Sequence, residues 1–190
     1  MALTTYTAGE VLTAASLNDN LAYAVTVPVA APGGLTLISA TTIGTTVSSV
    51  TVTGAFSATY DNYRIKITGV VGSAAADTTF QLSGITTSVY AYSGFYQSIG
   101  TSTIVAFGGT TTSTPIGTLG TTLNTQINID LSSPNLAVAK YLDIATCSNN
   151  IRVNQAAQCN STVQATGFTI TPDSGILTGG TIYVYGYAKA

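Results

Sequence analysis

Short runs in which apolar and polar residues alternate begin near residue 35 and recur to the end of the chain. Residues 63–68 are a clear case, because three apolar side chains alternate with Arg64, Lys66 and a threonine. A half-buried strand turns successive side chains to opposite faces, so Arg64 and Lys66 are expected to face solvent. Similar runs occupy residues 35–40, 47–53, 79–82, 89–96, 103–107, 125–131, 141–145, 162–171 and 181–187.

These runs predict about ten short strands separated by Gly, Asn, Pro or Asp turns. No segment between them has the length and period of a helix, which argues against βαβ units and a parallel sheet. We therefore expect an all-β domain, an antiparallel β-sandwich of jelly-roll type, with a closed barrel as the second choice. Alternation leaves the order of the strands open.

The first 34 residues follow a different pattern. Thr7 and Glu10 have the spacing of a capping box, which starts a helix, and Leu17 and Leu21 then fall on one helical face. Residues 27–34, VPVAAPGG, cannot continue a helix. The sequence thus predicts a helical leader and linker over residues 1–34, followed by a β domain over residues 35–190.

Charged residues are scarce, at 6% of the chain, with five Lys or Arg against seven Asp or Glu and a net charge of −2. Phosphate binding relies on clustered basic residues, so nucleic acid is not an expected partner. No uninterrupted apolar run is long enough for a membrane span, and no secretory signal is visible. So little charge protects a free monomer poorly from association, which favours a stable oligomer.

An enzymatic function is not expected. The chain has no His, which removes Ser-His and Cys-His nucleophile pairs and the commonest metal ligand. A glycosidase-like carboxylate pair would have to come from five aspartates whose spacing singles out no two: Asp61, Asp77, Asp130, Asp143 and Asp173. No cofactor or metal site is expected.

The two cysteines, Cys147 and Cys159, allow two interpretations. They stand at the ends of a segment short enough for one disulfide to close a loop. Buried free thiols are the slightly favoured alternative.

A cluster of aromatic residues is the strongest candidate for direct binding. Tyr90, Tyr92, Phe95 and Tyr96 lie close together in the sequence, and tyrosine rings stack on sugar faces while their hydroxyls bond to sugar hydroxyls. These residues are candidates for contact with a receptor or with another subunit. The alternative is an ordinary strand face covered by a neighbouring sheet, which the absence of Trp favours.

Three segments carry a resemblance to a known family. Residues 7–20, TAGEVLTAASLNDN, resemble the opening of tail-fibre, head-fibre and minor tail proteins of tailed bacteriophages. Residues 56–65, FSATYDNYRI, and residues 179–189, GGTIYVYGYAK, are similar to a middle signature and a closing strand of the same proteins. In the middle segment, Tyr60 and Tyr63 are expected to cover a sheet edge with hydrated hydroxyls.

The resemblance implies a non-enzymatic structural protein of the virion, assembled in the cytoplasm of the bacterial host. A short tail fibre or minor tail protein is the first expectation, and a capsid decoration or head-fibre protein is the alternative. The leader would attach to other phage structural proteins or to sister subunits through Glu10, Leu12, Leu17 and Leu21. The resemblance also implies a homotrimer, and a host-surface glycan is the ligand that the aromatic cluster would suit. A carbohydrate-binding module or adhesin domain is a further alternative, from another class of protein.

Overall fold

The structure is a computed structural model that describes residues 34–122, 124–148 and 150–189. Every regular element in these ranges is a strand, and all strand pairs are antiparallel, which confirms the predicted all-β class. The strands are β1 (Leu35–Thr42), β2 (Val50–Val52), β3 (Asn62–Gly72), β4 (Asp77–Leu82), β5 (Tyr90–Ser98), β6 (Ile104–Thr111), β7 (Thr114–Thr118), β8 (Thr125–Ser132), β9 (Lys140–Ser148), β10 (Ile151–Cys159), β11 (Phe168–Pro172), β12 (Leu177–Thr178) and β13 (Thr181–Tyr187).

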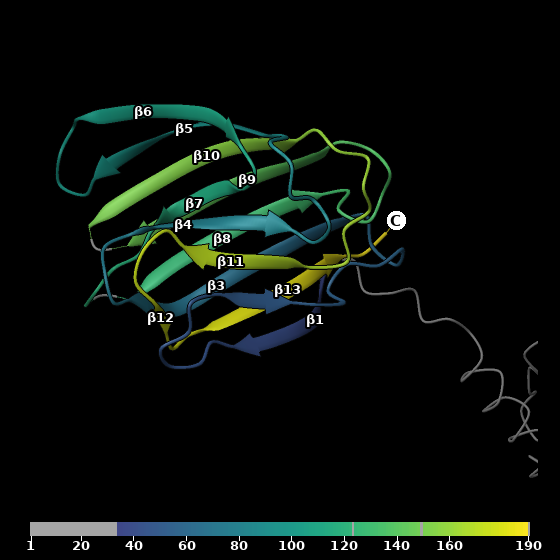
Figure 1. The fold of residues 1–190 in the computed structure, drawn as a ribbon, viewed down its shortest axis with the longest axis horizontal. Helices are drawn as coiled ribbons and strands as arrows, with labels where there is room; N and C mark the ends of the chain where they lie inside the picture. Colours follow the sequence, from purple (N-terminus) through teal and green to yellow (C-terminus); the bar gives the residue numbers. More distant parts are fainter. Residues whose placement is uncertain (1–33, 123, 149, 190) are drawn as a thin grey trace, which may run out of the picture. The chain divides into compact units, whose positions relative to one another are not determined.

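The strands form two sheets (Figure 1). The large sheet has nine strands in the order β1-β13-β3-β8-β9-β10-β5-β6, with β12 paired to β3, and the small sheet has the order β2-β11-β4-β7. The large sheet is open, with β1 and β6 at its edges, so the closed alternative is wrong. One apolar core contains side chains of both sheets, which gives a sandwich-like arrangement.

Alternation decides which side chains enter the core. In β3, Tyr63, Ile65 and Ile67 are at most 1% exposed, whereas Arg64 and Lys66 point outward as expected. Burying side chains of this size contributes about 1.5–3 kcal/mol each relative to exposure. The same alternation continues in β8 and β9, so the middle of the large sheet has a continuous apolar inner face.

Two of the segments that carry the family resemblance meet in space. The ring of Tyr60 lies against Gly186, where an added Cβ would be 2.4 Å from the ring, and Lys189 forms an ion pair of 2.9 Å with Asp61. The Tyr63 hydroxyl accepts from the Ser57 N–H at 2.8 Å and donates to the Ser57 carbonyl at 2.9 Å. Tyr63 is fully buried. The expectation of a hydrated Tyr63 hydroxyl is therefore wrong, because backbone groups replace the water.

The large sheet extends beyond the small one. The residues of β5 and β6 alternate only weakly in burial, and most of β6 is exposed on both faces. Figure 1 shows this pair at the rim of the molecule, away from the layered middle. The small sheet reaches the inner face of this extension at Tyr90, and the part of that face beyond Tyr90 forms the floor of the site described below.

The strands that the sequence did not predict are β7, β10 and β12. β7 contains Pro115 and Gly117, which normally interrupt strands, but it is an edge strand, where Pro is tolerated. The predicted run 162–171 begins as a strand only at Phe168.

The disulfide alternative is wrong, because both cysteines are free. Cys147 is opposite Arg152 and Cys159 is opposite Lys140, so the two thiols lie at different ends of the β9–β10 pair. Cys159 is buried, but Cys147 is exposed, so the favoured alternative of buried thiols holds for Cys159 alone.

The predicted helical leader falls outside the described residues, apart from Gly34. In the part of the chain that is described, no helix is long and apolar enough to cross a membrane.

Candidate functional site

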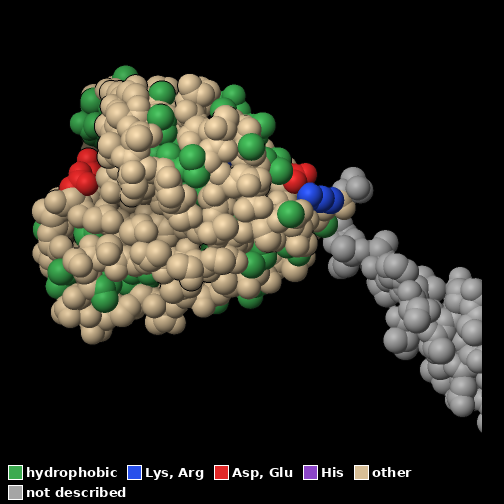
Figure 2. Space-filling model, turned by 45° about the vertical axis from the view of Figure 1, so that its right-hand side comes forward, with side chains coloured by type: hydrophobic (Ala, Val, Ile, Leu, Met, Phe, Trp, Pro, Cys, Tyr) green, Lys and Arg blue, Asp and Glu red, His purple; other side chains and the backbone are tan. Residues whose placement is uncertain are grey.

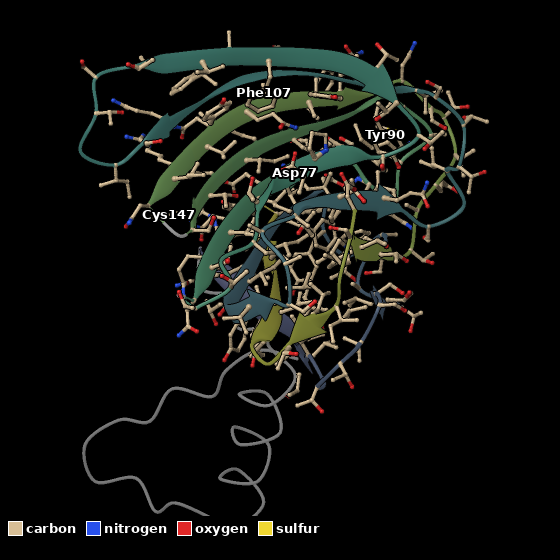
Figure 3. All side chains as sticks on the ribbon, turned by 60° about the vertical axis from the view of Figure 1, so that its left-hand side comes forward. Asp77, Tyr90, Phe107 and Cys147 are labelled. Carbon is tan, nitrogen blue, oxygen red and sulfur yellow. The ribbon has the colours of Figure 1, made fainter. Side chains whose placement is uncertain are left out.

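A groove of about 710 Å³ lies where the inner face of the sheet extension meets the edge of the small sheet. Its walls come from β4, β5, β6, β7, β10 and the turn that follows β11. Figure 3 shows Phe107 and Asp77 on strands of the two different sheets that border it. The lining residues are Asp77, Thr79, Tyr92, Tyr96, Phe107, Thr111, Ser113, Pro115, Gly117, Thr118, Ile151, Val153, Gln155 and Asp173.

The floor of the groove carries three aromatic rings. The period of two in β5 places Tyr92 and Tyr96 on one face, and Phe107 of β6 lies between them. The Phe107 centroid is 6.3 Å from that of Tyr92 and 6.5 Å from that of Tyr96. Tyr96 is 39% exposed. The rings therefore form an open platform on which a flat apolar surface can stack.

Two glycines make room for this platform. Gly94 pairs with Gln155 of β10 and with Phe107 of β6, so no side chain separates the two tyrosines. An added Cβ at Gly94 would be 2.5 Å from the Asn154 carbonyl oxygen. At Gly109 an added Cβ would be 3.0 Å from the Tyr92 hydroxyl, which shows how closely that ring approaches β6.

Gln155 supplies a buried amide to the floor. It is only 3% exposed, and its Nε2 donates to the Thr114 hydroxyl at 2.7 Å. Its Oε1 is buried and has no hydrogen-bond partner among the described residues. A buried acceptor without a partner costs about 1–3 kcal/mol of folding stability, so a ligand donor that bonds to it recovers part of this cost on binding.

Two carboxylates stand at the other wall. Asp77 begins β4, and its backbone carbonyl accepts from the Asp173 N–H at 2.8 Å, which holds the two aspartates side by side. The Thr118 hydroxyl donates to Asp77 Oδ1 at 2.5 Å. Neither carboxylate has an ion-pair partner among the described residues, and no Lys or Arg lines the groove.

The edge strand β7, which forms one lip of the groove, is fixed by hydroxyl groups of β9. Thr146 donates to the Ile116 carbonyl, and Ser148 donates to the Thr118 carbonyl. Gly117, at φ +120°, allows the close approach of the Thr146 side chain. These bonds occupy acceptors that an edge strand otherwise exposes, and they connect the lip to β9.

The predicted aromatic cluster is divided by the structure. Tyr92 and Tyr96 line the groove, whereas Phe95 lies on the opposite face of β5 near Asp143. Tyr90 is fully buried, and its hydroxyl accepts from the Leu82 N–H at 2.9 Å. Burial raises the pKa of Tyr90. The expectation of a contact role is wrong for Tyr90, because its side chain lies in the core with its hydroxyl at the end of β4.

Beside Tyr90 lies a second group of buried ionisable residues, Lys140 and Cys159. Lys140 Nζ donates to the carbonyls of Val138 and Ser161, both at 2.7 Å. Burial lowers the pKa of Lys140 and raises that of Cys159. All three side chains are 0% exposed, so this cluster is part of the core and no ligand reaches it.

The sequence did not identify Phe107, Gln155, Asp77 or Asp173 as members of one site. Their ranges are far apart in the chain, and only the strand order brings them together. The predicted anchoring residues Glu10, Leu12, Leu17 and Leu21 lie outside the described residues. Within the described ranges, no three potential metal ligands of the His, Cys, Asp or Glu type gather in one place.

Comparison with known proteins yields no relative for this chain. No family model, no curated protein and no solved structure matches it. The groove and the sequence resemblance are therefore the basis for an argument about function.

Proposed function

We propose that this chain is a structural protein of a tailed bacteriophage particle that contacts the host surface through the groove. The observation that carries the proposal is the platform of Tyr92, Phe107 and Tyr96, open to solvent at the rim of the domain. Exposed aromatic platforms are suited to the flat faces of saccharides, which cover bacterial surfaces. The leader over residues 1–34 would hold the chain to the particle.

The contact between the family-like segments supports the phage interpretation. Residues 56–65 and 179–189 are far apart in sequence, yet Tyr60 packs on Gly186 and Asp61 pairs with Lys189. Joint use of both segments in one structural unit gives a physical reason for their appearing together in one chain.

We also propose that the domain is a jelly roll enlarged by two hairpins. A jelly roll has eight strands in two sheets built from two Greek keys. Without the pairs β5–β6 and β9–β10 and the short β12, the remaining strands, renumbered in chain order, run 1-8-3-6 in one sheet and 2-7-4-5 in the other. This interleaving supports the proposal. The aromatic floor of the groove then belongs to the additions, and its other wall to the small sheet of the scaffold.

A binding role is proposed rather than an enzymatic one. Asp77 and Asp173 do share the groove, but a glycosidase needs one carboxyl kept protonated, usually by apolar surroundings. Both aspartates are exposed, and Asp77 already accepts a hydrogen bond from the Thr118 hydroxyl. Their geometry suits acceptance of ligand hydrogen bonds.

Assembly as a homotrimer completes the proposal. Both edge strands of the large sheet carry exposed apolar residues: Leu35 and Leu37 in β1, and Ile104 and Val105 in β6. Figure 2 shows a face on which charged side chains gather in only two small groups. Several copies on one particle would turn weak single contacts into a useful avidity.

The test combines location with adsorption. Gold-labelled antibody against the protein is expected to decorate phage particles, and its position separates a tail protein from a head-fibre or capsid decoration protein. Excess purified protein is expected to slow adsorption of the phage, and Tyr96→Ala is expected to weaken this competition by about 3- to 10-fold. Phe95→Ala, on the opposite face of the same strand, is the matched control and should compete normally. Unlabelled particles together with undiminished adsorption would refute the proposal.

A further inference from the structure

The groove offers hydrogen-bond acceptors and no positive charge. Asp77 and Asp173 present carboxylate oxygens at one wall, and Gln155 Oε1 lies at the floor without a partner among the described residues. The five basic residues are elsewhere: Arg64 is paired with Asp130, Lys189 with Asp61, Lys140 is buried, and Lys66 and Arg152 are exposed away from the groove.

This distribution selects against acidic ligands. A carboxylate or phosphate on the ligand would approach two like charges at short range and find no Lys or Arg to compensate them. A hydroxyl or an ammonium group would instead donate to these oxygens, and a bond to a charged acceptor is stronger than a neutral one. The ligand therefore has to be rich in donors and free of acidic groups.

The aromatic floor adds a second requirement. Tyr92, Phe107 and Tyr96 present three rings along the groove, with neighbouring centroids 6.3 and 6.5 Å apart. Such a row accommodates consecutive flat units, each with an apolar face and polar edges. A chain of pyranose rings has this character, because its C–H faces stack and its hydroxyls point sideways.

We infer that the groove binds a non-acidic saccharide chain and prefers units with a free amino group beside Asp77 and Asp173. This inference rests on the proposed function in that it specifies the ligand of the same groove. Tyr92, Phe107 and Tyr96 stack the rings, Gln155 Oε1 accepts a hydroxyl, and the two carboxylates select the ammonium.

Three soluble probes test the inference with the full chain: a glucosamine tetramer, its fully N-acetylated counterpart, and a galacturonic acid tetramer. The first two share one backbone and differ in charge. Titration calorimetry or saturation-transfer NMR at millimolar concentration is expected to detect both glucosamine-based tetramers and not the acidic one. The amino form is expected to bind about five-fold more tightly, as a contact of about 1 kcal/mol in water would give.

Variants separate stacking from charge. Tyr96→Ala is expected to weaken both glucosamine-based probes by about 3- to 10-fold, whereas Phe95→Ala on the opposite face leaves them unchanged. The double variant Asp77→Asn/Asp173→Asn is expected to remove the preference for the amino form and to retain the N-acetylated probe. Asp143→Asn, which removes one carboxylate outside the groove, is the charge control and should keep the preference.

The inference is overturned if the acidic tetramer binds best, if neither glucosamine-based probe binds, or if Phe95→Ala and Tyr96→Ala behave alike. Failure of the proposed function looks different. Saccharide binding with the expected variant pattern, but without antibody label on particles, would refute the phage role and leave the ligand class standing. Adsorption that depends on Tyr96, without the expected pattern of probe binding, would refute the proposed ligand class and leave the phage role standing.

Discussion

Gly94 has Gln155 on one side and Phe107 on the other, and its lack of a side chain brings β5 and β10 close together at the floor of the groove. An added Cβ would meet backbone and Cα atoms of β10 at 2.5–2.9 Å, and these atoms cannot rotate away. The position of Tyr92 and Tyr96 therefore depends on a residue that itself offers nothing to a ligand.

Gly94→Ala is expected to lower the free energy of unfolding by about 1–3 kcal/mol, because β10 has to shift to relieve the overlap. Urea unfolding followed by circular dichroism measures the change. Gly109→Ala is the matched control, since its Cβ would meet the side chain of Tyr92, whose hydroxyl at 3.0 Å is the nearest atom and the far end of that side chain. It is expected to cost less than about 1 kcal/mol. Equal losses in both variants would contradict this account.

At this scale the sequence predicted the facing of side chains but not their burial. The period of two put Tyr90 and Tyr92 on one strand face, and the structure adds Tyr96 to it. It contained no information on where the small sheet ends, and that boundary makes Tyr90 a core residue and leaves Tyr96 exposed. Coverage depends on the packing of distant strands, which local pattern does not encode.

Three neighbouring strands are tied together on the outer face of the large sheet by one carboxylate. Arg64 of β3 donates to both oxygens of Asp130 in β8 at 2.8 and 2.7 Å, and the Tyr187 hydroxyl of β13 donates to Asp130 Oδ1 at 2.7 Å. The Arg64 guanidinium, and to a smaller extent Tyr187, hold the pKa of Asp130 below its usual value against the opposing effect of burial. The same pairing raises the pKa of Arg64.

Asp130→Asn is expected to lower the free energy of unfolding by about 1 kcal/mol at pH 7, a modest value because both side chains of the ion pair are about two-fifths exposed. Since the folded pKa of Asp130 is depressed, its contribution is complete above the unfolded pKa of about 3.9 and is lost as pH falls through the folded value. The wild type and the variant should therefore converge in strong acid. Thermal unfolding from pH 7 to pH 2 measures this.

Asp143→Asn is the control for this prediction. Asp143 is directly opposite Asp130 on β9, where two like charges destabilise a cross-strand pair. Its removal is expected to leave stability unchanged or slightly raised at pH 7. A difference between Asp130→Asn and wild type that persisted undiminished at pH 2 would rule out the ionic explanation.

At the scale of the elements, strands whose apolar and polar residues alternate clearly were predictable from the sequence. Strands built from residues of low β-propensity were not. β10, IRVNQAAQC, has Gln, Ala and Asn where a strand usually has branched or aromatic residues. It forms because β9 and β5 pair with it on both sides over its whole length. A site assembled on such a strand, with Gln155 at its centre, leaves no local signal in the sequence.

Within the described ranges, the large sheet has two unpaired edge strands, β1 and β6, and neither carries a Lys, Arg, Asp or Glu. β1 carries Leu37 at 52% exposure and β6 carries Ile104 at 60%. Exposed strand edges without charged residues invite pairing with another chain. We propose that the trimer forms through these edge strands.

The full chain is expected to have the mass of a trimer in solution, and Ile104→Lys is expected to reduce that mass, because it puts a charge on the β6 edge. Light scattering coupled to size-exclusion chromatography, with and without residues 1–33, measures both effects. Ser93→Lys adds the same charge to β5, whose neighbours are already paired, and should leave the mass unchanged. A monomer in both the full and the shortened form would contradict self-assembly.

The position of β13 has a consequence for the order in which this domain is made. β13 lies between β1 and β3 and pairs with both, although it leaves the ribosome long after them. Until then β1 and β3 lack the strand that lies between them. The long loop between β3 and β13 has to close, at a cost in chain entropy, before their pairing contributes any stability. A nascent chain interrupted before Thr181 would expose unpaired backbone groups of β1 and β3 to chaperones and to other nascent chains. The large sheet can therefore reach its final strand order only after β13 has left the ribosome.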